Sequence, residues 1–305
     1  GSVFMNLKQL EAFVKVAEGG SFSKAAKALY LTQPTISAHI SSLEKELNVR
    51  LFVRNTKEVS LSEDGKELYQ YAYQMVELEK KIEEMFSADA RKGVKCITIA
   101  SSTIPAQYLL PDILAKFNEK YPREQFKIME TDSAKVVEMV VSHMADLGFT
   151  GTVLEKKHCK YIPFYNDELV LITPNNERFR ELKETQDNLD WLQTEGIIMR
   201  EEGSGTRKET ERLLKSMGIA LEDLNVVASI ENSETIKRSV KSGMGVTVIS
   251  KLAAQEDIES GAVLCFPLSS DGSASARDLN LVYNKNYHLS TSAERFVKVV
   301  KGMYC

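Results

Sequence analysis

Residues 32–44 read TQPTISAHISSLE, and this stretch decides the fold of the N-terminal part of the chain. Thr32 can cap a helix that has Pro34 in its first turn. Apolar residues recur at helical spacing and predict the buried side of that helix. They are Ile36, Ile40, Leu43 and Leu47. The opposite side is left with small polar residues.

Two shorter helices are predicted before this one, and a two-stranded ribbon after it. The first carries apolar residues from Leu7 to Ala17, and the second runs from Lys24 to Leu29 behind serine caps. The ribbon pairs residues 49–54 with 59–62. This order predicts a winged helix-turn-helix over residues 5–62, although three helices with a solvated polar side also occur as an ordinary packing unit.

A winged helix-turn-helix places its recognition helix in the DNA major groove, with residues near the helix start at base edges. Gln33 can bind adenine through two hydrogen bonds, and Thr35 can offer its methyl group to thymine. Basic residues of the ribbon suit phosphates. The residues expected to contact DNA are Ser23, Thr32, Gln33, Pro34, Thr35, Ser37, His39, Arg50, Arg54 and Lys57.

The charge of the chain is unevenly distributed. Its 305 residues include 39 Lys and Arg against 43 Asp and Glu, a net charge of -4. Residues 5–62 hold eight basic and five acidic residues, or +3, which leaves -7 for the remainder. This local positive balance permits binding to a polyanion but does not require it.

Residues 63–90 are predicted to form one long linker helix. Its apolar residues follow intervals of three and four, which is typical of a coiled coil and predicts pairing with a second copy of the chain. They are Leu68, Tyr71, Met75, Leu78, Ile82 and Met85. The alternative is a helix that packs on its own domain.

Short apolar strands alternate with amphipathic helices over residues 94–305, which predicts a mainly parallel α/β domain. Nine strands suit two small lobes with a cleft between them: lobe I (94–165 and 267–305) and lobe II (166–266). The expected strands are Cys96 to Ala100, Phe126 to Glu130, Leu147 to Phe149, Leu169 to Thr173, Gly196 to Met199, Val226 to Ile230, Val246 to Ile249, Val263 to Pro267 and Leu279 to Tyr283.

Hydroxyl-rich loops follow strands in both predicted lobes, and hydroxyls beside helix N-termini favour a small oxyanion or carboxylate. Each loop taken alone is also explained by helix capping. Arg200 and Arg207 are candidates to pair with an acid, or to form ordinary ion pairs. The residues expected to bind the small molecule are Ser101, Ser102, Thr103, Thr150, Gly151, Ser204 and Thr206.

No motif in the sequence predicts catalysis, a metal site or a cofactor. The chain lacks a Gly-x-Ser-x-Gly elbow, a phosphate-binding loop and a His-Glu-x-x-His pattern, so we expect no enzyme. Four dispersed cysteines suit neither zinc nor a disulfide framework, and Cys96 and Cys265 lie in apolar runs that predict burial. No apolar run is long enough for a membrane span, and no secretion signal is recognisable, so we expect a cytoplasmic protein.

Several motifs, in order, resemble the LysR-type transcriptional regulators. They are residues 7–13 (LKQLEAF), 20–26 (GSFSKAA), 32–37 (TQPTIS), 43–47 (LEKEL), 51–54 (LFVR) and 61–65 (LSEDG). The resemblance extends over essentially the whole chain. It implies an effector domain like the type 2 periplasmic binding proteins, with a small-molecule effector between its lobes.

The resemblance also implies partners. Linker helices of the family pair two subunits, effector domains pair further into tetramers, and the operator is an interrupted inverted repeat of double-stranded DNA. RNA polymerase is a candidate further partner. Many members carry Arg where this chain has Ala38, Ser41 and Ser42, so we expect the ribbon to carry more of the phosphate binding.

Overall fold

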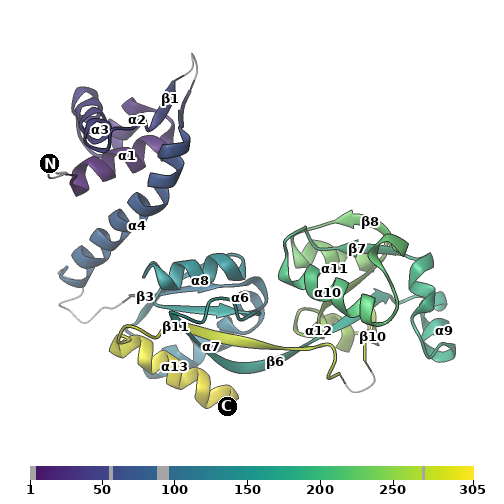
Figure 1. The fold of residues 1–305 in the computed structure, drawn as a ribbon. Coiled ribbons are helices and arrows are strands. Elements are labelled where there is room, and N and C mark those ends of the chain that lie inside the picture. Colours follow the sequence, from purple (N-terminus) through teal and green to yellow (C-terminus); the bar gives the residue numbers. More distant parts are fainter. Residues whose placement is uncertain (1–4, 55–57, 88–95, 270–271) are drawn as a thin grey trace. The chain divides into compact units, whose positions relative to one another are not determined.

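The computed structural model describes residues 5–54, 58–87, 96–269 and 272–305 (Figure 1). The chain forms two compact units, Gly1–Val94 and Lys95–Cys305. Each unit contains its own hydrophobic core. Within the described ranges, no helix combines the length and the apolar character that crossing a membrane requires.

The first unit is a three-helix head with a ribbon and a long helix. Its elements are α1 (Leu7–Gly19), α2 (Phe22–Ala28), α3 (Gln33–Leu47), β1 (Phe52–Arg54), β2 (Val59–Leu61) and α4 (Glu63–Met85). β1 and β2 pair in antiparallel fashion. Ile36, Ile40 and Leu43 are at most 3% exposed, as the spacing in the sequence predicts, and Leu47 of the same stripe is partly buried. The predicted helix-turn-helix is therefore confirmed.

Ser62 and Gly65 fix the long helix α4 to the ribbon. The Ser62 hydroxyl accepts from the Gly65 N–H at 2.9 Å and so caps the helix. A Cβ atom on Gly65 would lie only 2.2 Å from the Leu51 carbonyl oxygen. Only glycine permits this close approach, so the start of α4 is held against the residue that leads into β1.

The two sides of α4 meet different surroundings. Ala72 and Val76 are buried in the core of the head, so one side packs on its own domain. Tyr71, Ile82 and Met85 lie on the predicted apolar stripe and are 66%, 59% and 66% exposed. Most of the stripe is therefore open to solvent within a single copy of the chain, whereas Leu68 packs against the core of the head.

The second unit contains one mixed sheet covered by helices. Its strands are β3 (Cys96–Ser101), β4 (Gln125–Glu130), β5 (Leu147–Thr150), β6 (Cys159–Pro174), β7 (Gly196–Met199), β8 (Asn225–Ser229), β9 (Val246–Ser250), β10 (Val263–Pro267) and β11 (Ala276–Asn284). Its helices are α6 (Thr103–Tyr108), α7 (Leu110–Lys120), α8 (Ser133–Val141), α9 (Glu177–Thr185), α10 (Gly205–Ser216), α11 (Ser233–Lys241), α12 (Lys251–Glu259) and α13 (Thr291–Tyr304), with short 3-10 turns at Asp190–Thr194 and Leu221–Asp223.

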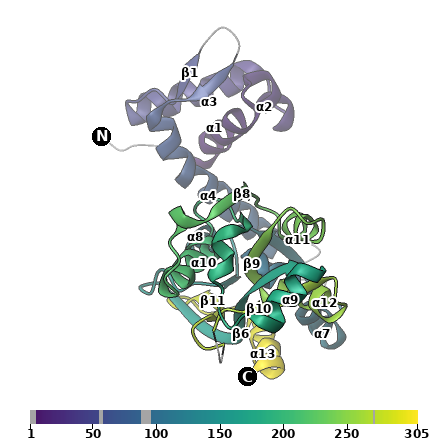
Figure 2. The ribbon, with the colours of Figure 1, turned by 90° about the vertical axis from the view of Figure 1, so that its right-hand side faces the viewer.

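Two long strands connect the two parts of this sheet. The strand order is β4-β3-β5-β11-β6-β9-β7-β8, with β10 paired to β6. We call the part around β3, β4 and β5 lobe I, and the part around β7, β8 and β9 lobe II. β6 and β11 run between the lobes in Figure 1, and α13 packs beside α7 in lobe I (Figure 2).

The sheet differs from the prediction in two respects. Its parallel pairs lie inside each lobe, whereas β6 and β11 form antiparallel pairs with all their neighbours, so the sheet is mixed rather than mainly parallel. β6 also begins at Cys159 rather than Leu169, because its first half is partly exposed and lacks a continuous apolar run. Helix α9 is not predicted, because its sequence lacks the apolar stripe that indicates a helix; Phe179 is its buried residue.

Candidate functional site

Helix α3 begins where its sequence predicts. The Thr32 hydroxyl accepts from the Thr35 N–H at 3.3 Å, and the two threonine hydroxyls lie 2.8 Å apart. Pro34 occupies the first turn, where a missing N–H costs nothing. The N-terminal turn of α3 is thereby fixed, and with it the direction of the side chains beside it.

The outward side of α3 carries the predicted base-contacting residues. Gln33 and Pro34 are exposed, and Thr35, Ser37 and His39 are partly buried. Ser23 is exposed at the start of α2, where its hydroxyl lies 2.9 Å from that of the cap Ser21. This surface is polar, and it is backed by the buried stripe of α3.

Of the three basic residues predicted to bind phosphates in and beside the ribbon, only Arg50 has a described side chain. Arg50 is exposed just before β1. The backbone of Arg54 ends β1, but its side chain lies outside the described part of the chain, as does the whole of Lys57. The phosphate contacts assigned to these three residues stay predictions.

The predicted effector residues of lobe I divide into two groups. Ser101 and Thr150 are fully buried, and their hydroxyls donate at 2.9 Å to the carbonyl oxygens of Ser102 and Thr152. These two hydroxyls hold their own loops. Ser102 and Thr103 are partly exposed at the start of α6, and the Ser102 side chain makes no capping bond to the helix. Ser102 and Thr103 thus present the hydroxyls with which lobe I can meet a ligand.

In lobe II, Ser204 and Thr206 have different roles. Ser204 caps α10, because its hydroxyl accepts from the Arg207 N–H at 3.4 Å. Thr206 is partly exposed in the first turn of the same helix, and its hydroxyl accepts from Nη1 of Arg277 at 3.4 Å.

Arg277 brings predicted residues of both lobes together, although its sequence context gave no sign of this. Besides its bond to Thr206, its Nη1 would lie 3.7 Å from a Cβ atom built on Gly151. Its Nε donates to Oδ2 of Asp167 at 3.2 Å. Ser250 donates to the other oxygen of that aspartate at 2.8 Å. A guanidinium group that is paired with the buried Asp167 therefore lies between the Gly151 loop of lobe I and the α10 terminus of lobe II.

Arg200 and Arg207 form ordinary ion pairs. Nε of Arg200 lies 2.9 Å from Glu201, and Nε of Arg207 lies 3.0 Å from Glu211. Arg207 also donates from Nη1 to the Arg200 carbonyl oxygen at 2.8 Å. Of the two interpretations of these arginines, the geometry favours the structural one.

A second contact joins the lobes through α6 and α11. The Tyr108 hydroxyl of α6 donates to Glu234 at 3.3 Å, and Nζ of Lys237 lies 5.7 Å from the tyrosine ring centroid. Lys237 is nearly buried and also bonds the Ala253 carbonyl oxygen at 2.7 Å and Asp257 at 3.3 Å. Burial raises the pKa of Tyr108, and the hydrogen bond from Lys237 lowers the pKa of Glu234.

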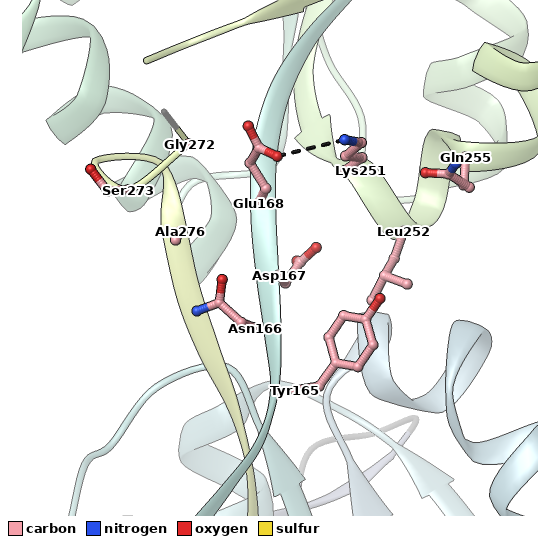
Figure 3. A pocket seen from close by; sticks show the side chains of 10 residues that line it. All are labelled: Tyr165, Asn166, Asp167, Glu168, Lys251, Leu252, Gln255, Gly272, Ser273 and Ala276. Atoms are coloured by element: carbon pink, nitrogen blue, oxygen red, sulfur yellow. Dashed lines mark ion pairs between the residues drawn. The ribbon is translucent and has the colours of Figure 1, made fainter. Parts of the chain in front are cut away.

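A pocket of about 480 Å³ lies beside β6, where it passes α12 (Figure 3). Its charged pair is Glu168 with Lys251, at 3.7 Å. The lining residues are Tyr165, Asn166, Asp167, Glu168, Lys251, Leu252, Gln255, Gly272, Ser273 and Ala276. None of the predicted effector residues is among them. The pocket is therefore lined by other residues, although it shares Asp167 with the contact that Arg277 makes to Thr206.

The four cysteines lie in different surroundings. Burial, helped by Glu155, raises the pKa of the Cys159 thiol to about 11. Burial also raises the pKa of Cys265, which is partly buried. Cys96 is exposed, so its predicted burial is wrong: as the first residue of β3 it lies at the end of the buried run.

Among the described residues, no group of His, Cys, Asp and Glu side chains is suited to a metal ion.

Comparison with known proteins assigns both units. The lysR family of bacterial regulatory helix-turn-helix proteins matches residues 7–66, and the LysR substrate binding domain matches residues 95–304. An uncharacterised HTH-type transcriptional regulator of Methanocaldococcus jannaschii is 34% identical over 262 residues, which cover 86% of this chain and 88% of that protein. The regulator CysL of Bacillus subtilis is 28% identical over 97% of this chain and 96% of its own length.

Solved structures have the same fold. The crystal structure of full-length CbnR complexed with its target DNA has a TM-score of 0.75 to this chain at 20% identity, with 98% of this chain and 99% of that chain covered. Full-length BenM has a TM-score of 0.58 at 20% identity, with 98% and 97% covered. The chain belongs to the LysR family of DNA-binding transcriptional regulators, which are not enzymes, and it carries that family's effector-binding domain.

Proposed function

We propose that this regulator binds, as a dimer, an interrupted inverted repeat of double-stranded DNA in the cytoplasm. A twofold dimer suits such a repeat because each half-site then receives the same helix. The exposed Gln33 at the start of α3 supports base contacts there. Arg50, Arg54 and Lys57 are assigned to the phosphates.

The open stripe of α4 supports the dimer. Tyr71, Ile82 and Met85 are apolar or aromatic residues at coiled-coil spacing that the rest of their own unit leaves exposed. A second α4 would cover them. Pairing of effector domains into a tetramer, and contact with RNA polymerase, complete the proposed assembly.

The proposed effector is a small anion or carboxylate held between the lobes. The observation that carries this proposal is the position of Arg277, which bonds Thr206 of lobe II and lies beside Gly151 of lobe I. The hydroxyls of Ser102 and Thr103 add neutral donors. A ligand that bridges the lobes favours one lobe arrangement, and this changes how paired subunits hold and bend the DNA.

A thermal-shift screen of the full-length protein tests the effector proposal. Inorganic sulfate, phosphate, and small mono- and dicarboxylates are compared at constant ionic strength. A ligand of the folded state raises the melting temperature in a saturable manner. Failure of every compound to do so would contradict the proposed anion class.

Variants then locate the site. The double variant Ser102→Val with Thr103→Val is expected to lose the thermal shift but keep DNA binding. Thr291→Val is the matched control, because Thr291 begins α13 as Thr103 begins α6. A shift that survives in the double variant would place the ligand elsewhere, with the pocket beside Glu168 and Lys251 as the next place to examine.

A further inference from the structure

The turn between α2 and α3 holds a tyrosine in an unusual backbone conformation. Tyr30 has a φ of 55°. Its N–H donates to the Lys27 carbonyl oxygen at 3.3 Å, and the Leu31 N–H donates to that of Ala26 at 2.9 Å. These two bonds are those of a Schellman motif, which ends a helix through one residue in the left-handed region. The turn therefore requires a positive φ at position 30.

The same head ends its two other short helices with residues suited to this conformation. Gly20 follows α1 with a φ of 62°, and Asn48 follows α3 with a φ of 55°. Glycine pays no steric penalty there, and asparagine tolerates the left-handed region better than other residues do. A bulky aromatic residue such as Tyr30 is strained there. Backbone geometry alone gives no reason for a tyrosine.

Packing gives no reason either. The Tyr30 side chain is 96% exposed, so the fold gains almost nothing from its ring. Lys24 and Lys27 of α2 are also exposed beside this turn. Tyr30 precedes Thr32, the cap of α3, by two residues, which places their Cα atoms at most about 7.6 Å apart. An exposed aromatic ring thus lies next to the end of α3 that meets DNA, in basic surroundings.

We propose that Tyr30 contacts the sugar-phosphate backbone of bound DNA and that the head accepts a strained turn in order to present this ring. Its hydroxyl donates to a phosphate oxygen, while the ring lies against the adjoining sugar. Tyrosine is among the side chains that bind DNA phosphates, and such contacts position the protein without reading sequence. This inference rests on the DNA-binding function of α3 and assigns that interface a residue outside the predicted set.

The contact has a property that separates it from those of lysine and arginine. Tyrosine is uncharged, so its loss releases no additional counterions and leaves the salt dependence of binding unchanged. A phosphate contact also contributes equally to a preferred and an arbitrary DNA sequence. Loss of Tyr30 is therefore expected to weaken binding to every duplex by the same factor.

The test measures folding and DNA binding of the full-length protein in parallel. Tyr30→Gly is expected to raise the urea midpoint, because the strain is relieved and no packing is lost. The same variant should bind DNA more than about tenfold more weakly, because the hydrogen bond to a charged group accounts for about that factor and the ring contact adds to it. Tyr30→Phe, which keeps the ring but lacks the hydroxyl, should lose only the hydrogen-bond contribution and bind about tenfold more weakly. The probes are a 30-bp duplex selected by the protein from a random library, and a scrambled duplex of equal length.

Asn48→Gly is the matched control, because it changes a residue of equal φ at the other end of α3. It should bind both duplexes like the unaltered protein. Unchanged DNA affinity of Tyr30→Gly would overturn the proposal. The exposed ring would then be a candidate contact for a protein partner instead of DNA. A loss confined to the selected duplex would overturn the backbone assignment. Failure of the unaltered protein to bind either duplex would contradict the DNA-binding function itself as well as the Tyr30 contact.

Discussion

Arg277 and Asp167 stand directly opposite each other on β11 and β6, and their charged groups meet at 3.2 Å. Their side chains are 13% and 1% exposed, so the pair is almost fully withdrawn from water. Ser250 of β9 donates a further hydrogen bond to the aspartate at 2.8 Å. The pair therefore joins the strands that connect the lobes, and its arginine also contacts Thr206.

Replacing this arginine should lower both stability and ligand response. Arg277→Gln leaves the Asp167 carboxylate buried without its cation, which costs about 3 kcal/mol of unfolding free energy in comparable sites. The proposed effector also loses its cationic contact. Urea denaturation and the anion thermal-shift screen measure the two effects separately.

Two further variants make the Arg277 result interpretable. Adding Asp167→Asn to Arg277→Gln removes the buried charge and should recover part of the stability but not the ligand response. Arg212→Gln breaks a pair with Glu209 whose arginine is 58% exposed, and it should cost less than about 1 kcal/mol. If Arg277→Gln lowered the unfolding free energy no more than Arg212→Gln does, the pair of Arg277 with Asp167 would not stabilise the strands that connect the lobes.

The open side of α4 predicts a change in assembly without a change in folding. Ile82 is 59% exposed within one copy, so Ile82→Glu should leave the head folded. A carboxylate in a coiled-coil seam opposes pairing, and sedimentation should show monomers at concentrations where the unaltered protein is dimeric. Glu83→Gln, at the neighbouring exposed position, should stay dimeric. A dimer that tolerates Ile82→Glu would place the subunit interface elsewhere.

The contact of Glu234 with Lys237 and Tyr108 predicts an acid-sensitive link between the lobes. The hydrogen bond from Lys237 holds the pKa of Glu234 below its ordinary value of 4.5. The carboxylate therefore contributes stability above about pH 4.5, which is lost as the pH falls through the lowered pKa. The pKa of Asp257 is also lowered, by the hydrogen bond from Lys241 against an opposing effect of burial, so part of the acid sensitivity belongs to it.

Urea midpoints between neutral and acidic pH check this link. Glu234→Gln should be less stable than the unaltered protein at neutral pH, and the difference should shrink below about pH 4.5. The effect is expected to be small, because the Glu234 side chain is 54% exposed. Glu138→Gln, in an exposed pair with Lys135, leaves the cross-lobe contact intact and serves as control. A pH-independent difference would show that the charge of Glu234 does not matter.

Alkylation should separate the cysteines by environment. The thiolate is the reactive form, and the pKa of Cys159 is raised to about 11, so iodoacetamide at mildly basic pH should spare it. The exposed Cys96 and Cys305 should react first, as followed by mass spectrometry. Cys159 should become reactive only in urea. Modification of native Cys159 as fast as of Cys96 would contradict its inert, structural role.

Local signals allowed the head to be predicted closely from its sequence. Ile36, Ile40 and Leu43 define a buried side by their spacing, and the side chain of Thr32 supplies the helix start within its own segment. Neither feature depends on distant residues. The same locality explains why most strands of the second unit were placed within a few residues.

The candidate effector site could be predicted only in part, because its geometry depends on strand register. Asp167 and Arg277 are 110 positions apart, and only the pairing of β6 with β11 brings them together. The buried hydroxyls of Ser101 and Thr150 also look like ligand donors in the sequence, but they bond carbonyl groups of their own loops. Sequence patterns cannot distinguish a hydroxyl used within the chain from one presented to solvent.

The central claim is that the outward side of α3 reads DNA sequence. Its most direct test is the affinity of the double variant Gln33→Ala with Thr35→Ala for a selected duplex relative to a scrambled one, with Ser41→Ala, exposed on the same helix, as control. We predict that the double variant loses at least about tenfold in this ratio, because each good base contact contributes about 1–3 kcal/mol of discrimination. A ratio equal to that of the unaltered protein, with the fold intact, would contradict the account.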